Sequence, residues 1–354
     1  RLFQAKLSRL TFGLTPAGMT EVYVSWLAHL ALCPGRMAAL ACFPLHNAKM
    51  QAREAIDSSK PPTPPDPRFK SEDWSNYPWK SYVDMFHGCE EFWDLATKNI
   101  PGLSPQYERA ISFSARQMLD AISPANSLLT NPEILFETIR RGGANLADGA
   151  VNAFEDFARN KAGEPAAGME DFKVGEKVAT AKGKVVFRND LIELIQYDPV
   201  TSDVYKEPIL ILPAWIMKYY ILDLSPHNSM VKWLVEQGHT VFIVSWKNPG
   251  AEARNRGMDD YIRDGALAAI DAVSSITDNA KIHLTGYCLG GTLAMITAAL
   301  MAHDNDDRLK SLSLLAAQGD FTEAGEMMIF VTPSEVAYLE NMMWAQGYLD
   351  TKQM

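Results

Sequence analysis

The residues with the clearest chemical potential surround Cys288, in the segment IHLTGYCLGGT at residues 282–292. This segment predicts a buried strand that turns sharply into an apolar helix, with the cysteine at the turn. Glycines at 286 and 290 remove the Cβ clashes that such a turn would otherwise create. A thiol lifted out of a sheet in this way is a nucleophile suited to acyl groups. The alternative is a tight turn around a small buried cysteine; the strand, the second glycine at 291 and the helix together argue against it.

The pattern is typical of the nucleophile elbow of α/β-hydrolases, with cysteine in place of the usual serine. An acyl-transfer site also needs N–H donors for the oxyanion, a general base and a group that orients the base. The backbone N–H of Leu289 directly follows the nucleophile and is expected to be one oxyanion donor. The second donor is expected from the loop after an earlier strand, at the N–H of Ile216 or a neighbour.

The general base is the part of this site that the sequence does not supply. In α/β-hydrolases the acid and the histidine follow the nucleophile, and His303 is the one histidine after Cys288. His303 falls at the end of the predicted helix, about 20 Å from the thiol at 1.5 Å per residue. It is interpreted as a solvated helix end, and none of the seven histidines is assigned as the base. Asp320 follows the next strand, where it is either the orienting acid or a turn cap.

Strands and helices must position these groups within an α/β unit that follows a mainly helical region. Residues 1–57 are predicted as a helical N-terminal region, 58–68 as a proline-rich, semi-rigid linker, and 69–170 as a second helical domain. Between 171 and 324, short apolar runs alternate with helices, which predicts an α/β-hydrolase-like parallel sheet covered on both faces. The last strands of such a sheet are expected to lie beyond the end of the given sequence. Residues 325–354 are interpreted either as helices packed on the core or as the start of a mobile lid.

Composition narrows the classes of function. The chain is 47% apolar and 21% charged, as in an ordinary soluble protein. Its net charge of −10, without a basic stretch, argues against nucleic acid as a partner. The four cysteines have no metal-ligand spacing, so no metal is predicted and a reducing, cytoplasmic setting is expected. The apolar stretch Val22–Cys33 is too short to span a bilayer, so no transmembrane segment is predicted.

Further segments resemble the poly(3-hydroxyalkanoate) synthases, the polymerases of bacterial polyester storage granules. These segments, which occur in the same order, are SPAN at 123–126, TNPE at 130–133, KYYILDL at 218–224, EQGHTVF at 236–242, SWKNP at 245–249, DDY at 259–261 and the elbow itself. The front segment, residues 14–41, resembles the variable N-terminal region of such synthases more weakly.

The resemblance implies polymerisation of (R)-3-hydroxyacyl-CoA with release of CoA, through a covalent thioester on Cys288. The CoA thioester is then the substrate, and no cofactor is expected. Asp223 occupies a family position near the site, although a helix-capping role explains it almost as well. The resemblance also implies a homodimer, granule association in the cytoplasm, and the growing polyester as partner. Phasin-type proteins are further expected partners.

One departure from the family is serious. The family's catalytic Asp and His lie beyond a lid-like insertion, and this chain stops at Met354 before reaching them. The chain is therefore expected to be an inactive fragment of an active enzyme. Two alternatives stay open. A cysteine-elbow hydrolase of the dienelactone type would share the elbow but lack the 218–224 and 246–249 segments. A non-catalytic granule-associated protein is the alternative if the chain really ends at Met354.

Overall fold

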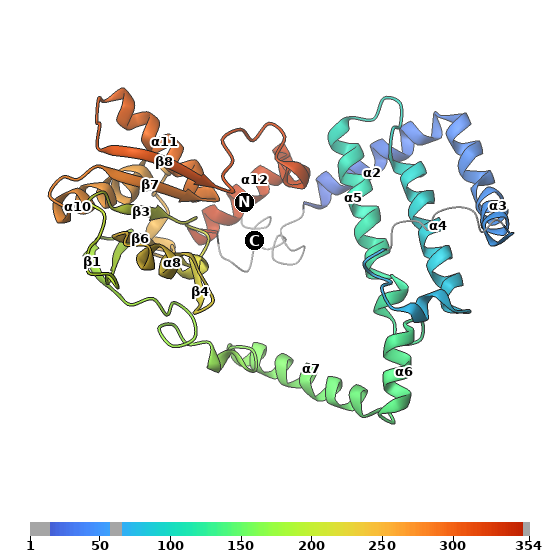
Figure 1. Ribbon diagram of the computed structural model, residues 1–354. Coiled ribbons are helices and arrows are strands. Elements are labelled where there is room, and N and C mark those ends of the chain that lie inside the picture. The colour runs from blue at the N-terminus through green and yellow to red at the C-terminus, as the bar shows by residue number, and fades with distance from the viewer. Residues whose placement is uncertain (1–14, 57–65, 350–354) are drawn as a thin grey trace. The chain divides into compact units, whose positions relative to one another are not determined.

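The computed structural model describes residues 15–56 and 66–349 (Figure 1). Contacts divide the chain into a helical unit, up to Ala158 together with Ala324–Met342, and a second unit that contains Arg159–Glu323. Most of the predicted proline-rich linker lies outside the described residues, and the domain boundaries given above stay predictions.

The helical unit has its own buried core. The Trp26 Nε1–H group donates to the Ala96 carbonyl oxygen at 2.8 Å and joins the first described helix to the third. Asn131 Oδ1 accepts from the N–H groups of Glu133 at 2.9 Å and Ile134 at 3.2 Å, so it caps the helix that begins at Pro132. The helices before the sheet are α2 (Pro16–Ala31), α3 (Pro34–Ile56), α4 (Trp79–Thr97), α5 (Pro105–Ala121), α6 (Pro132–Arg140) and α7 (Ala144–Ala162), with the short turns η1 (Glu72–Ser75), η2 (Pro124–Asn126) and η3 (Met169–Asp171).

Among the described residues, no single helix is both long and apolar enough to cross a bilayer. α2 and the Pro34–Lys49 part of α3 reach that length and hydropathy only as a pair, with a 91° bend between them.

The second unit is built on a six-stranded sheet in the order β1-β2-β6-β3-β7-β8. The predicted α/β class is confirmed, and the sheet is mixed rather than parallel throughout. β6, β3, β7 and β8 are parallel, whereas β1 and β2 are antiparallel because a connection as short as 189–191 can join only a hairpin. The strands are β1 (Gly183–Arg188), β2 (Ile192–Tyr197), β3 (Ile209–Leu212), β6 (Val241–Trp246), β7 (Ile282–Tyr287) and β8 (Leu309–Leu315), with a separate β4 (Asp223–Ser225) and β5 (Asn228–Ser229) hairpin.

Helices cover both faces of this sheet, as Figure 1 shows for α8, α10 and α11. α8 packs its Val231, Leu234 and Val235 side chains on one face, and α10 and α11 pack on the other. This two-sided burial explains why β3 consists of four apolar residues, each less than one-tenth exposed. The remaining elements are α8 (Met230–Glu236), α9 (Met258–Asp260), the π-helix η6 (Tyr261–Leu267), α10 (Ala268–Ile276), α11 (Leu289–His303) and α12 (Pro333–Gln346), with the turns η4 (Tyr219–Leu222), η5 (Ala251–Ala253) and η7 (Gly325–Phe330).

Candidate active site

Cys288 forms the turn between β7 and α11. Its φ of 54° and ψ of −126° lie in a backbone region that residues with a side chain rarely adopt. The Cys288 N–H donates to the Leu315 carbonyl oxygen of β8 at 2.9 Å, which ties the turn to the neighbouring strand. The residue is partly exposed. A strained, accessible residue between a central strand and a helix is the geometry of a nucleophile elbow.

Glycines are required on both sides of the elbow by close backbone contacts. A Cβ atom on Gly290 would lie 2.1 Å from the Leu212 carbonyl oxygen, and one on Gly286 would lie 2.4 Å from Gly291 Cα. Real Cβ atoms do not approach other heavy atoms so closely, and the backbone atoms they would meet belong to packed elements. The predicted reason for these two glycines is therefore confirmed.

The two segments expected to supply the oxyanion donors lie against each other. Leu289 begins α11, and an N–H group at this position has no acceptor within its own helix. Gly290 contacts the backbone of Leu212 and Pro213, which leads directly into the loop that carries Ile216. This loop turns where the Met217 N–H donates to the Ala214 carbonyl oxygen at 3.0 Å. The donor roles of Leu289 and Ile216 stay predictions.

Trp246 anchors this loop, a role that the sequence analysis missed. Its Nε1–H group donates to the Pro213 carbonyl oxygen at 2.7 Å. The Trp246 ring lies 5.4 Å from that of Tyr261, which lies 5.4 Å from that of Trp215 in the same loop. The SWKNP segment could have suggested this contact. Its tryptophan is the last residue of β6, which lies beside β3 in the sheet.

No hydrogen bond joins a histidine to Cys288 within residues 15–56 and 66–349. His303 ends α11 with its side chain 83% exposed, beside Asp304 at 2.9 Å, so its interpretation as a solvated helix end is confirmed. His283 Nδ1 lies 2.7 Å from Ser311 Oγ on the adjacent strand. A histidine paired with Cys288 is thus not seen among the described residues.

The two acidic candidates each accept a hydrogen bond from a backbone N–H group. Asp320 Oδ1 accepts from the Thr322 hydroxyl at 2.5 Å and from its N–H at 2.9 Å, and these bonds lower the pKa of Asp320. The turn-cap interpretation is confirmed for this residue. Asp223 is fully buried; its Oδ2 accepts from the Ala181 N–H at 3.0 Å, and its carbonyl oxygen accepts from the Ala179 N–H at 2.8 Å. Asp223 thereby fixes the segment that precedes β1.

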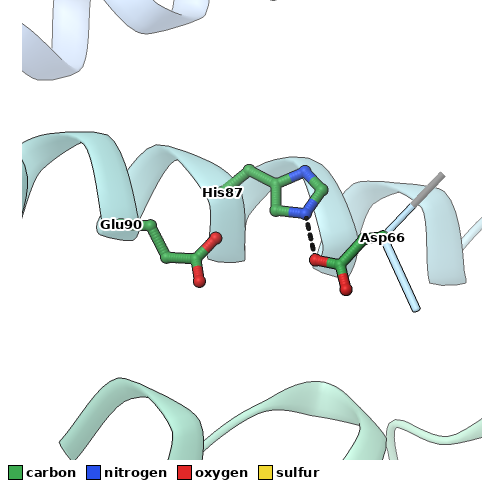
Figure 2. A group of neighbouring side chains, drawn as sticks. All are labelled: Asp66, His87 and Glu90. Atoms are coloured by element: carbon green, nitrogen blue, oxygen red, sulfur yellow. Dashed lines mark hydrogen bonds and ion pairs between the residues drawn. The ribbon is translucent and has the colours of Figure 1, made fainter. Parts of the chain in front are cut away.

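A group of potential metal ligands lies in the helical unit, at Asp66, His87 and Glu90 (Figure 2). Asp66 Oδ2 and His87 Nε2 lie 3.0 Å apart. Arg68 occupies the position between the carboxylates, because its Nη2 donates to Asp66 at 2.7 Å and to Glu90 at 2.8 Å. Its Nη1 also donates to Asp120 on α5 at 2.7 Å. The Arg68 guanidinium already donates hydrogen bonds to all three carboxylates, so the cluster is an arginine-centred clamp between the chain at Asp66, α4 and α5.

We predict that Arg68→Met destabilises the helical unit by about 1–3 kcal/mol, because it leaves partly buried carboxylates without a counter-charge. The matched control is Arg140→Met, which breaks an exposed pair with Glu137 and should destabilise the protein much less than Arg68→Met. Hydrogen bonds from Arg68 hold the pKa of Asp66 well below its usual range. The ion pair therefore stabilises the fold above about pH 4, and this stabilisation is lost as the pH falls further.

Urea unfolding followed by tryptophan fluorescence measures both the stability loss of Arg68→Met and its dependence on pH, when it is run at neutral pH and at about pH 3. The wild-type protein should lose more stability on acidification than Arg68→Met. Equal losses in the two proteins would contradict the clamp.

Family models match most of the chain. The model described as poly-beta-hydroxybutyrate polymerase (PhaC) N-terminus matches residues 65–234, and a poly-beta-hydroxybutyrate polymerase N-terminal model matches residues 1–36. The alpha/beta hydrolase fold model matches residues 207–345, which include the elbow. A carboxyl esterase from Bacillus coagulans is among the solved structures that match in part, with 15% identity over 47% of this chain and 50% of that chain and a TM-score of 0.32. This likeness is too distant to add to the fold assignment.

Curated relatives carry the same family name. The poly(3-hydroxyalkanoate) polymerase of Methylorubrum extorquens is 40% identical over 301 residues, 83% of this chain and 49% of that protein. The poly(3-hydroxyalkanoate) polymerase subunit PhaC of Rhizobium meliloti is 37% identical over 82% of this chain and 48% of that protein, and the subunit of Cupriavidus necator is 41% identical over 65% and 39%. The chain spans about half the length of the first two of these relatives. With its elbow, its mixed sheet and these identities, the chain belongs to the poly(3-hydroxyalkanoate) polymerase family.

Proposed function

We propose that the full-length protein containing this chain polymerises 3-hydroxyacyl groups, which it takes from CoA thioesters through Cys288. The observation that carries the proposal is the position of Cys288 at a strained turn between β7 and α11, in a chain of the polymerase family. A nucleophile held by rigid backbone on both sides loses little entropy on reaching its substrate, which favours covalent catalysis.

The first half-reaction forms the acyl-enzyme. The Cys288 thiolate attacks the carbonyl carbon of the thioester, and the developing oxyanion accepts hydrogen bonds from the N–H groups of Leu289 and Ile216. The tetrahedral intermediate collapses, the carbon–sulfur bond to CoA breaks, and the CoA thiolate takes the proton that the general base removed from Cys288. That base is expected from a part of the protein beyond the described residues.

The second half-reaction lengthens the polyester. The hydroxyl group that ends the growing chain gives its proton to the base and attacks the acyl group on Cys288. A carbon–oxygen bond forms, the carbon–sulfur bond to Cys288 breaks, and the sulfur is ready for the next monomer. Sulfur suits both halves, because exchange between thioesters is nearly isoergic and transfer from a thioester to an alcohol is downhill.

Exposed apolar side chains in the helical unit offer a surface for partners. The first two described helices expose apolar side chains, Val24, Leu27 and Leu32 on or just after α2 and Leu45 on α3, each more than half exposed. Apolar groups of this kind are compatible with a second copy of the protein, phasin-type partners or the polyester surface. We propose that the full-length protein is a cytoplasmic homodimer associated with polyester granules.

Incubation of the full-length protein with (R)-3-hydroxybutyryl-CoA tests the reaction. We expect one free CoA thiol for each monomer consumed, insoluble polyester, and a 3-hydroxybutyryl adduct on the Cys288 peptide after acid quenching. Thiol titration, light scattering and mass spectrometry measure the three products. Release of CoA with free 3-hydroxybutyrate alone would instead identify a hydrolase, and the absence of any CoA release would favour a non-catalytic protein.

A further inference from the structure

A lysine and an asparagine meet on the rim of the proposed active site. Lys218 lies in the loop after β3, two residues beyond Ile216, and Asn248 lies in the loop after the adjacent strand β6. Lys218 Nζ donates to Asn248 Oδ1 at 3.4 Å. The hydrogen bond between Trp246 and Pro213 joins the same two loops at their bases. Both loops leave the carboxyl ends of parallel strands, the edge at which α/β sheets bind ligands.

The positive charge of Lys218 is not neutralised by this surface. The neighbouring Lys247 pairs with Glu252 at 3.6 Å, and Arg256 pairs with Asp264 at 3.4 Å and with Asp190 at 3.9 Å. Lys218 is exposed, and among the residues that the structure describes it forms no ion pair with a carboxylate.

A cavity of about 350 Å³ adjoins this pair. Asn248 lines it together with Lys247, Arg256 and the ring of Tyr261, and the acidic residues in its wall are the partners of those two cations. Tyr261 is fixed by its packing against Trp215 and Trp246. The rim therefore presents the unpaired ammonium group of Lys218 beside a cavity that is lined in part by Tyr261.

We propose that Lys218 and Asn248 form a subsite for a phosphate group of the CoA part of the substrate. This inference rests on the proposed function. The thioester must reach Cys288, while the phosphates, which are costly to bury, stay at the exposed rim. The Lys218 ammonium and the Asn248 Nδ2–H group both donate hydrogen bonds to phosphate oxygens, and the amide oxygen of Asn248 orients the lysine. A local cation also offsets the repulsion between an anionic substrate and a chain of net charge −10.

The test compares two thioesters of (R)-3-hydroxybutyrate in the full-length protein, one with CoA and one with pantetheine, which lacks phosphate. We expect Lys218→Ala to reduce the ratio of kcat/KM values, CoA over pantetheine, roughly fivefold, the effect of one exposed charge pair. Asn248→Asp should reduce it similarly, because the new carboxylate pairs with Lys218 and repels phosphate. Lys218→Arg should keep the ratio. The matched control is Lys232→Ala on α8, an exposed lysine near Glu236, which should leave the ratio unchanged.

Calorimetric binding of free CoA and of pantetheine separates this inference from the proposed function. A roughly fivefold weaker Kd for CoA in Lys218→Ala, without a change for pantetheine, supports the subsite even if no polymer forms. An unchanged Kd for CoA together with an unchanged kcat/KM ratio would overturn the subsite while leaving a working polymerase intact. Equal losses for both compounds would also overturn it, because Lys218 would then act on the loop rather than on phosphate.

Discussion

Replacement of Cys288 by alanine in the full-length protein is expected to lower kcat/KM for (R)-3-hydroxybutyryl-CoA by about three orders of magnitude or more. In the proposed cycle, the substitution removes the sulfur atom that carries the acyl group between CoA and the polyester. Cys288→Ser should lose nearly as much, for two reasons. A hydroxyl group needs a stronger base than a thiol, and an acyl ester has no free-energy advantage over the ester bond of the product. Steady-state release of CoA measures both variants.

The matched control for these variants is Cys89→Ser, an exposed cysteine of α4 in the other unit. It should retain wild-type kinetics, because its thiol is remote in the chain from the elbow and has no role in the proposed cycle. Retention of more than about a tenth of the activity by Cys288→Ala would exclude the covalent mechanism. An active serine variant would count against sulfur-based acyl exchange but would leave the elbow as the reactive turn.

Local signals explain which parts of the fold the sequence could predict. The apolar run 209–212 is β3 to the residue, because a short central strand is buried on both faces and carries no polar position. The elbow was predictable for a different reason. The motif itself is local, since Gly286 is required by the backbone of Gly290 and Gly291, a few residues away. Gly290 also meets the end of the adjacent strand β3, a contact that only the fold reveals.

Non-local contacts explain the features that the sequence could not predict. Residues 261–267 form a π-helix rather than a regular α-helix, and no local pattern in the sequence indicates it. A Cβ atom on Gly265 would lie 2.6 Å from the Trp246 ring, so tertiary packing against β6 constrains this turn. The Arg68 clamp joins acidic residues 22 and 52 positions away in the sequence, and no spacing rule links them. The contact between Lys218 and Asn248 likewise forms only because β3 and β6 are neighbours in the sheet, which the sequence does not reveal.

Gly290→Ala is expected to have the largest effect on stability among single-methyl substitutions at the elbow. The added methyl group would lie 2.1 Å from the Leu212 carbonyl oxygen and 2.6 Å from the Pro213 carbonyl carbon. Both are backbone atoms at the end of a buried central strand, so neither can rotate away as a side chain would. We expect the free energy of unfolding of the α/β unit to fall by about 3 kcal/mol or more. Urea unfolding monitored by tryptophan fluorescence measures this change.

The same substitution should impair catalysis in any molecules that remain folded. Relief of the clash must move the start of α11 away from the loop after β3. This movement would separate the Leu289 N–H from the Ile216 N–H and weaken the proposed oxyanion site. The matched control is Gly257→Ala in the same unit, where a Cβ atom meets nothing within 4 Å and the backbone is extended. It should change stability by less than about 0.5 kcal/mol. If Gly290→Ala matches this control in both urea midpoint and kcat, the close packing of α11 on the end of β3 has no role in holding the elbow.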